Sequence, residues 1–405
     1  MKTVAIITEY NPFHYGHFYQ IERIKADLGE QTRIIAIMSG SFTQRGEIAI
    51  ADKSTRAAAA IEAGVDLVLE LPFPYSSSSA EFFAMGGVSI LNSLGIVDYL
   101  VFGSECGDLQ RLEKCAEIMS SDEYITAVSA LQDSRESREL GYPYLCEKAF
   151  GVLSGAYEEG LFSPNNILAI EYIKALKKLD SSIKPYTIKR ESSDYNDKAL
   201  RGGKIQSASA IRPLFYSSPK KALEYIPEDA RRIYFSAINE GVAPTEPDRL
   251  DSAVISFLRL NSPDAMKEIH DAKGGLYNRL HEISFEVNCI SALMQQAETK
   301  RYTNSRIRRA IWNSYFGVTS SVIRSLPSYT QVLGMNGTGR QLLKEIKKKS
   351  GFPVITKPSS YEKYGDEVIR QKELSDKADS IFALATKKNV CGRFSLKLTP
   401  YVKKG

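Results

Sequence analysis

The sequence has no long hydrophobic segment. None of the apolar runs among its 405 residues approaches the ~20 residues that a helix needs to cross a bilayer. The first residues, MKTVAIITEYNPF, begin like a signal peptide, but Glu9 interrupts the apolar run and no cleavage-like group of small residues follows. These absences argue against a membrane protein and against an exported one, so we expect a cytoplasmic protein with no membrane partner.

The cysteines are few and scattered. The chain has five, an odd number, and none belongs to a CxxC pair or to a Cys/His cluster. This distribution argues against a zinc site and against a disulfide framework, and it is typical of proteins in a reducing compartment. We therefore predict no metal site built from the side chains of this protein.

Acidic and basic residues are unevenly distributed along the chain. Residues 300–405 carry 22 Lys and Arg against 7 Asp and Glu, whereas residues 1–299 carry 31 against 41. Such asymmetry is typical of a protein whose C-terminal part binds a polyanion, although a solvated lysine-rich surface gives the same count. On charge alone both interpretations stay open.

Apolar runs alternate with helical patterns in the first half of the chain. The runs cover residues 4–7, 33–38, 65–71 and 97–102, and a further alternating segment covers 183–190. This order predicts right-handed βαβ units and a Rossmann-like parallel sheet, which is an α/β fold. Ligands bind such sheets beyond the carboxyl ends of the strands.

Two histidines lie where the first predicted strand gives way to a helix. The turn Asn11-Pro12 precedes HYGH at residues 14–17. A helix N-terminus favours an anion, Gly16 leaves room for a phosphate, and imidazoles can donate hydrogen bonds to phosphoryl oxygens. Capping or packing of the turn is the alternative role, but the pairing of the two histidines favours phosphate binding.

A second phosphate-binding pattern lies much later in the chain. Ser207 and Ser209 precede Arg212 by about one helical turn. Two hydroxyls ahead of an arginine at a helix N-terminus suit the β- and γ-phosphates of a nucleotide, although a simple Ser/Ala helix cap would have the same pattern.

These two segments together resemble the motifs of the HxGH nucleotidyltransferase superfamily. NPFHYGH matches HxGH, and SASAIR resembles ISSTxIR of the small nucleotidyltransferases, with Ala208 in place of a Ser and Ser209 in place of the Thr. The resemblance implies that residues 1–215 form a nucleotidyltransferase domain that binds ATP, and the helical, polar pattern of residues 108–160 predicts an insertion within it.

Strand-like runs all but disappear after Pro213. Residues 217–296 have the apolar spacing of amphipathic helices, and the glycine-rich segment TQVLGMNGTGR reads as a turn before a basic helix. We therefore predict a helical domain over residues 216–299 and a basic, mainly helical, region over 300–405 that is suited to a polyanion such as tRNA.

The start of the basic region has the features of a nucleic-acid contact. On the predicted helix, Arg306, Arg309 and Asn313 share one face, and Tyr302 and Trp312 flank it. Arginines on one face can hold phosphates, and aromatic rings beside them can stack on unpaired bases.

The motifs as a set resemble the tRNA(Met) cytidine acetate ligase family of Firmicutes. The blocks run from about residue 4 to about residue 340, and they are EYNPFHYGH, MSGSFTQRGEIAI, ELPFPY, SSAEFFAMGGVSIL, FGSE, SPNNILAIEY, SASAIR and RYTNSRIRRAIWNSYFGV. The resemblance implies that acetate attacks the α-phosphate of ATP, giving acetyl-adenylate and pyrophosphate. The wobble cytidine of elongator tRNA(Met) then takes the acetyl group and becomes N4-acetylcytidine. Step one needs no dedicated base because acetate is ionised at neutral pH, and Mg²⁺ is expected with ATP.

Motifs and resemblance select three groups of site residues. The catalytic group is His14, His17, Ser207 and Ser209. The ATP contacts that the resemblance implies are Ile7, Thr8, Glu9, Tyr10, Asn11, Pro12, Phe13, His14, Tyr15, Gly16, His17, Phe18, Tyr19, Gln20, Gly103, Asn165, Arg190 and Glu191. The expected contacts with the anticodon region of the tRNA are Arg301, Arg306, Arg308, Arg309 and Trp312.

Two other functions stay open at this point. A small-molecule adenylyltransferase of the same superfamily would act on a phosphorylated metabolite, but it leaves the basic C-terminal half without a role. A non-catalytic tRNA-binding protein would be expected to carry a damaged HxGH motif, whereas the motif here is intact.

Overall fold

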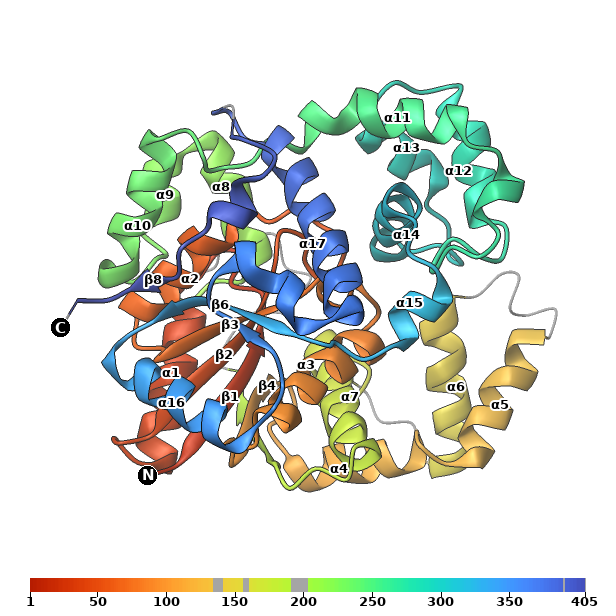
Figure 1. Cartoon of the computed structure of the whole chain (residues 1–405). Helices are drawn as coiled ribbons and strands as arrows, with labels where there is room; N and C mark the ends of the chain where they lie inside the picture. Colours follow the sequence, from red (N-terminus) through yellow and green to blue (C-terminus); the bar gives the residue numbers. More distant parts are fainter. Residues whose placement is uncertain (134–140, 156–159, 191–202, 389, 405) are drawn as a thin grey trace.

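A single eight-stranded sheet organises the molecule (Figure 1). The computed structural model describes residues 1–133, 141–155, 160–190, 203–388 and 390–404. The strand order is β5-β4-β1-β2-β3-β6-β7, and β8 pairs with β6. The first five strands are parallel and cover β1 (Thr3–Thr8), β2 (Arg33–Ser39), β3 (Leu67–Leu71), β4 (Tyr99–Ser104) and β5 (Lys184–Lys189). The predicted α/β fold is confirmed.

Both faces of the sheet are buried, which explains why the strands are continuous apolar runs. In β1, Val4 and Ile6 pack on one face and Ala5 and Ile7 on the other. The first face is covered by α1 (Tyr15–Leu28), α2 (Lys53–Glu62), α8 (Ala208–Ser217), α9 (Pro219–Leu223) and α10 (Glu228–Asn239). The second is covered by α3 (Ala80–Leu94), α4 (Leu109–Ile118), α7 (Pro164–Lys178) and α16 (Gly337–Lys349).

A group of helices lies beside the sheet and has a core of its own. These helices are α11 (Asp251–Leu260), α12 (Leu276–Ser284), α13 (Ile290–Ala297) and α14 (Asn304–Phe316). Phe42 and Phe73, from loops that follow β2 and β3, enter this core, so the group is packed against the sheet end. The remaining helices are α5 (Asp122–Asp133), α6 (Tyr142–Ser154), α15 (Ser320–Arg324) and α17 (Asp366–Leu384).

The C-terminal region contributes strands to the sheet, and the expectation that strands all but disappear after Pro213 is wrong in this respect. The segment read as a turn contains β6 (Thr330–Met335), which pairs antiparallel with β3. Two short strands, β7 (Val354–Ile355) and β8 (Tyr401–Val402), run parallel to β6. The region is otherwise helical, as predicted. The division at residues 215 and 299 stays a prediction.

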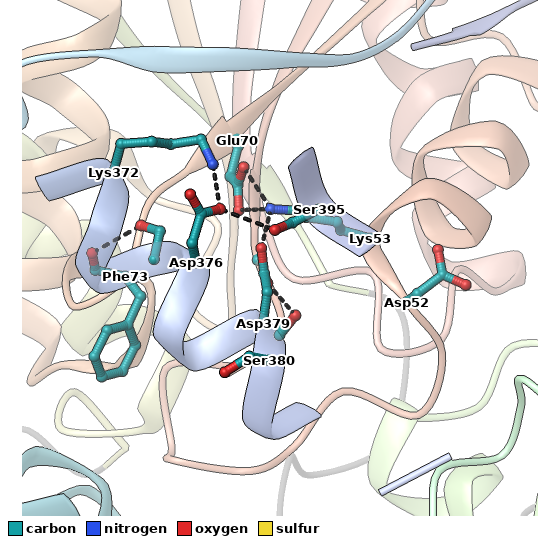
Figure 2. Close-up of polar contacts among 12 residues, drawn as sticks. Asp52, Lys53, Glu70, Phe73, Lys372, Asp376, Asp379, Ser380 and Ser395 are labelled. Atoms are coloured by element: carbon teal, nitrogen blue, oxygen red, sulfur yellow. Dashed lines mark hydrogen bonds and ion pairs between the residues drawn. The ribbon is translucent and has the colours of Figure 1, made fainter. Parts of the chain in front are cut away.

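A buried ionic cluster fixes helix α17 to the sheet (Figure 2). The Lys53 ammonium lies 2.7 Å from Glu70 Oε1 at β3 and 2.7 Å from Asp379 Oδ2 on α17. Ser41 Oγ donates to the other oxygen of Asp379. Burial lowers the pKa of Lys53, but the two carboxylates outweigh it and raise the pKa overall. The lysine is therefore charged and paired, and the cluster joins the loop after β2, helix α2 and strand β3 to the distant helix α17.

Candidate active site

The turn after β1 is held in place by buried hydrogen bonds. Asn11 Oδ1 accepts a bond of 2.7 Å from the Ile50 amide. The Phe13 amide donates to the Tyr234 hydroxyl at 2.9 Å. The loop after β2 and helix α10 thus fix the position of the residues that follow, which are the two histidines.

The histidines cap helix α1 through their Nδ1 atoms. His14 Nδ1 accepts a hydrogen bond of 3.0 Å from the Gly16 amide, and His17 Nδ1 accepts one of 3.3 Å from the His14 amide. An imidazole whose Nδ1 accepts carries its proton on Nε2. Both rings can therefore donate from Nε2, and their centroids are 3.9 Å apart.

Both imidazoles are uncharged at neutral pH. Burial and then the neighbouring Arg190 lower the pKa of His17 to about 3. Burial, His17 and the nearby arginines lower the pKa of His14 well below its ordinary value. The pair therefore offers phosphate two neutral hydrogen-bond donors.

Gly16 is required by the histidine itself. A Cβ at this position would lie 2.7 Å from His14 Cε1. A larger residue would displace the imidazole from the helix cap. The motif therefore needs glycine here for a second reason, besides the room that a phosphate was predicted to require.

The second motif lies against the first, although the two are far apart in sequence. Ser207 caps α8 by accepting a 3.2 Å bond from the Ala210 amide, and its Oγ lies 3.0 Å from that of Ser209. Arg212 donates to the Asn11 carbonyl at 3.0 Å. The N-termini of α1 and α8 thus meet in one cavity, at the carboxyl ends of the parallel strands.

Most of the predicted ATP contacts line this cavity. The predicted residues that line it are Ile7, Thr8, Glu9, Tyr10, Asn11, His14, Gly16, His17, Tyr19, Gln20, Gly103, Asn165, Arg190, Ser207 and Ser209. Pro12, Phe13, Tyr15 and Phe18 are not among the lining residues, and Phe13 and Phe18 pack in the core on the α1 side of the sheet. Glu191 lies outside the described residues. The roles of all these residues stay predictions.

Asn165 is positioned by a carboxylate that sequence reasoning gave no role. Glu105 Oε1 accepts 2.6 Å from Asn165 Nδ2, and its Oε2 accepts 2.8 Å from the Asn166 amide and 2.8 Å from Ser163 Oγ. Glu105 thus caps α7 from the loop after β4. The signal was present in the sequence as FGSE at the end of a predicted strand, but the partner of Glu105 lies 60 residues later.

Arg212 and Tyr172 also line the cavity and were not among the predicted contacts. Arg212 was visible as the last residue of the second motif. Tyr172 lies seven positions after Asn165, with Leu168 between them, and this spacing places all three on one side of α7.

Glu9 is the one carboxylate among the described residues that line the cavity. Its Oε1 accepts 2.8 Å from the Gln44 amide. Burial raises the pKa of this carboxyl. No group of three or more His, Cys, Asp or Glu suited to a metal occurs among the described residues.

The arginines of α14 are placed differently from the prediction. Arg309 pairs with Asp271, with Nε 2.8 Å from Oδ2, and Arg306 donates to the carbonyls of Asp271 and Lys273. The face predicted to hold phosphates is therefore turned toward Asp271. Helical spacing grouped these residues correctly, but it cannot say which face is exposed.

Trp312 is buried at 4% exposure. Its Nε1 donates to the Gly46 carbonyl at 3.0 Å, and its ring packs on Phe42. Trp312 also lines a cavity beside α14, so its predicted contact with a base stays a prediction. Arg301 is exposed and Arg308 is half-buried, so both remain candidates for a tRNA contact.

Replacing Arg309 with alanine will destabilise the fold by about 2 kcal/mol, because Asp271 is left without its ionic partner in a mostly buried place. Urea denaturation measures this loss. The matched control is Arg301→Ala, which removes an exposed arginine and should change the free energy of unfolding by less than about 0.5 kcal/mol. Equal stability of the two variants would contradict the structural role of Arg309.

Comparison with known proteins connects this site to a family. The family model described as HIGH Nucleotidyl Transferase matches residues 1–395. A tRNA(Met) cytidine acetate ligase of Thermoanaerobacter sp. (strain X514) is 40% identical over 398 residues, which are 96% of each chain. The chain belongs to the tRNA(Met) cytidine acetate ligase family of HIGH nucleotidyl transferases. The resemblance predicted from the sequence is confirmed.

Other members of the family agree in sequence and in structure. The ligase of Clostridium perfringens (strain ATCC 13124) is 38% identical over 370 residues, covering 89% of this chain and 90% of that one. Thermotoga maritima TmcAL bound with alpha-thio ATP superposes with a TM-score of 0.90 at 32% identity, and its apo form with 0.92. Both comparisons cover 100% of each chain. No described helix is long and apolar enough to span a membrane.

Proposed function

We propose that this protein is an ATP-dependent ligase that joins acetate to the wobble cytidine of elongator tRNA(Met). The observation that carries the proposal is the meeting of HYGH and SASAIR in one cavity, in a chain that is 40% identical to a tRNA(Met) cytidine acetate ligase. The cytoplasm is the proposed location, because tRNA is found there.

The first step activates acetate. A carboxylate oxygen attacks the α-phosphorus of ATP. The bond between this phosphorus and the oxygen that bridges the α- and β-phosphates breaks, and pyrophosphate leaves. His14 and His17 donate from Nε2 to phosphate oxygens, where negative charge grows in the transition state. Ser207, Ser209 and the N-terminus of α8 bind the departing phosphates, and Arg190 and Arg212 balance their charge.

Mg²⁺ is proposed to accompany ATP. The donor set fits an ion held mainly by the substrate, because Mg²⁺ typically binds one or two carboxylates together with phosphates, and Glu9 supplies one carboxylate to the cavity. Such an ion would neutralise phosphate charge.

The second step moves the acetyl group to RNA. The cytosine N4 bonds to the acetyl carbon, the bond between that carbon and the phosphate oxygen breaks, and AMP leaves. The base must leave the anticodon stack to reach the activated acetyl group. The basic C-terminal region, with Arg301 and Arg308, is proposed to bind the anticodon region of the tRNA, while residues 1–215 carry the chemistry and residues 216–299 support them.

Turnover of labelled ATP tests the proposal. Purified protein should form AMP and pyrophosphate only when acetate and tRNA are both present, and nucleoside analysis of the tRNA should show N4-acetylcytidine. AMP formation with a phosphorylated metabolite instead would indicate a small-molecule adenylyltransferase. Binding of tRNA without any use of ATP would indicate a non-catalytic protein.

A further inference from the structure

A second cavity adjoins the ATP cavity. It lies between the loop after β2, helix α8 and the group α11 to α14, and its volume is about 750 Å³, within the ~300–1,000 Å³ of typical ligand sites. Ser209 and Arg212 line both cavities. A molecule in the second cavity therefore reaches the phosphate end of the nucleotide site.

A carboxylate lies between two arginines at this junction. Glu47 Oε2 is 2.8 Å from Arg212 Nη2, and Glu47 Oε1 is 3.6 Å from Arg308 Nη1. Glu47 and Arg308 line the second cavity and are only half-buried, so a ligand can reach both. Glu47 thus connects Arg212, which lines the ATP cavity, to Arg308 on helix α14.

This pair matches the edge of a cytosine. The N4 amine donates hydrogen bonds, while N3 and O2 accept them, so a carboxylate beside a guanidinium complements the base. Uracil has a carbonyl in place of the amine, which would face the carboxylate oxygens of Glu47 unfavourably. Pro213 and Met294 add apolar lining for the faces of a ring.

We propose that the second cavity receives the cytosine that is acetylated, with Glu47 accepting from N4 and Arg308 donating to N3 or O2. The proposal rests on the proposed function and adds the acceptor site to it. N4 is then held at the junction formed by Ser209 and Arg212, facing the acetyl-adenylate. As N4 bonds to the acetyl carbon, AMP leaves with the phosphate oxygen and the proton of N4 passes to water.

Filling the cavity tests the proposal without changing the ATP site. Ser291 on α13 is exposed and Ser305 on α14 is half-buried. Both line the second cavity, and neither lines the ATP cavity. Ser291→Trp and Ser305→Trp should each lower tRNA acetylation at least about 100-fold. Acetate-dependent ATP–pyrophosphate exchange should stay within about threefold of the wild type, because only the second step needs a flipped base bound in the second cavity. The matched control is Gln296→Trp, an exposed position on α13 that lines neither cavity, and it should behave as wild type in both assays.

Base preference gives a second readout. Anticodon-arm transcripts with a wobble C should compete for the wild type about tenfold better than transcripts with a wobble U, and Glu47→Gln should remove this preference. Normal acetylation by both tryptophan variants, or a preference that survives in Glu47→Gln, would overturn the proposal. Absence of exchange in the wild type itself would instead refute the proposed function.

Discussion

Replacing His17 with alanine will lower acetate-dependent ATP–pyrophosphate exchange by at least about 100-fold, the usual cost of one donor to a developing oxyanion. The Nε2 proton of His17 is fixed toward the cavity because Nδ1 accepts from the His14 amide. Since the pKa of His17 is about 3, the ring is neutral at both pH 6 and pH 8, so the loss should be the same at both. Binding of tRNA should be unchanged.

Two conservative variants separate catalysis from capping. Asparagine can accept from the His14 amide in place of Nδ1, whereas glutamine can place a donor near the position of Nε2. We expect His17→Gln to keep more exchange activity than His17→Asn. The reverse order would mean that the main role of the ring is to cap α1.

Replacing Asp379 with alanine will lower the free energy of unfolding by about 3–5 kcal/mol, because it removes one partner from a fully buried ionic cluster. Lys53 would keep only Glu70, and the Ser41 hydroxyl would lose its acceptor. Urea denaturation at neutral pH gives the measurement.

Glu373→Ala is the matched control for this variant. Glu373 is an exposed carboxylate on the same helix, so its removal should change stability by less than about 0.5 kcal/mol. Similar stability losses in the two variants would show that the cluster contributes little, and that α17 is held by the apolar contacts of Ala378 and Phe382.

The parts of the fold that could be predicted are those with a local signal. The apolar run of β1 and the HYGH turn each depend on about ten neighbouring residues, and the structure has both at the predicted places. Strand β6 could not be predicted, because TQVLGM mixes polar and apolar residues and its partner β3 lies far back in the sequence. Its burial depends on that partner and not on its own pattern.

The site divides in the same way. The two phosphate motifs were legible because residue type and spacing carry the chemistry. The support given by Glu105 and the arrangement of Arg309 with Asp271 depend on contacts between distant segments. The helical pattern placed Arg306, Arg309 and Asn313 on one face without showing that all three would contact Asp271.

The antiparallel pairing of β6 with β3 has a consequence for synthesis on the ribosome. Thr330 donates through its hydroxyl to the Glu70 carbonyl, and these residues are 260 positions apart. At ~5–20 residues per second, the edge of β3 stays uncovered for roughly 13–52 s after it emerges. During that interval the nascent chain presents an unpaired apolar strand edge, and Lys53 and Glu70 lack their partner Asp379 on α17. Nascent chains halted before residue 330 should therefore be bound by chaperones, whereas complete chains should not.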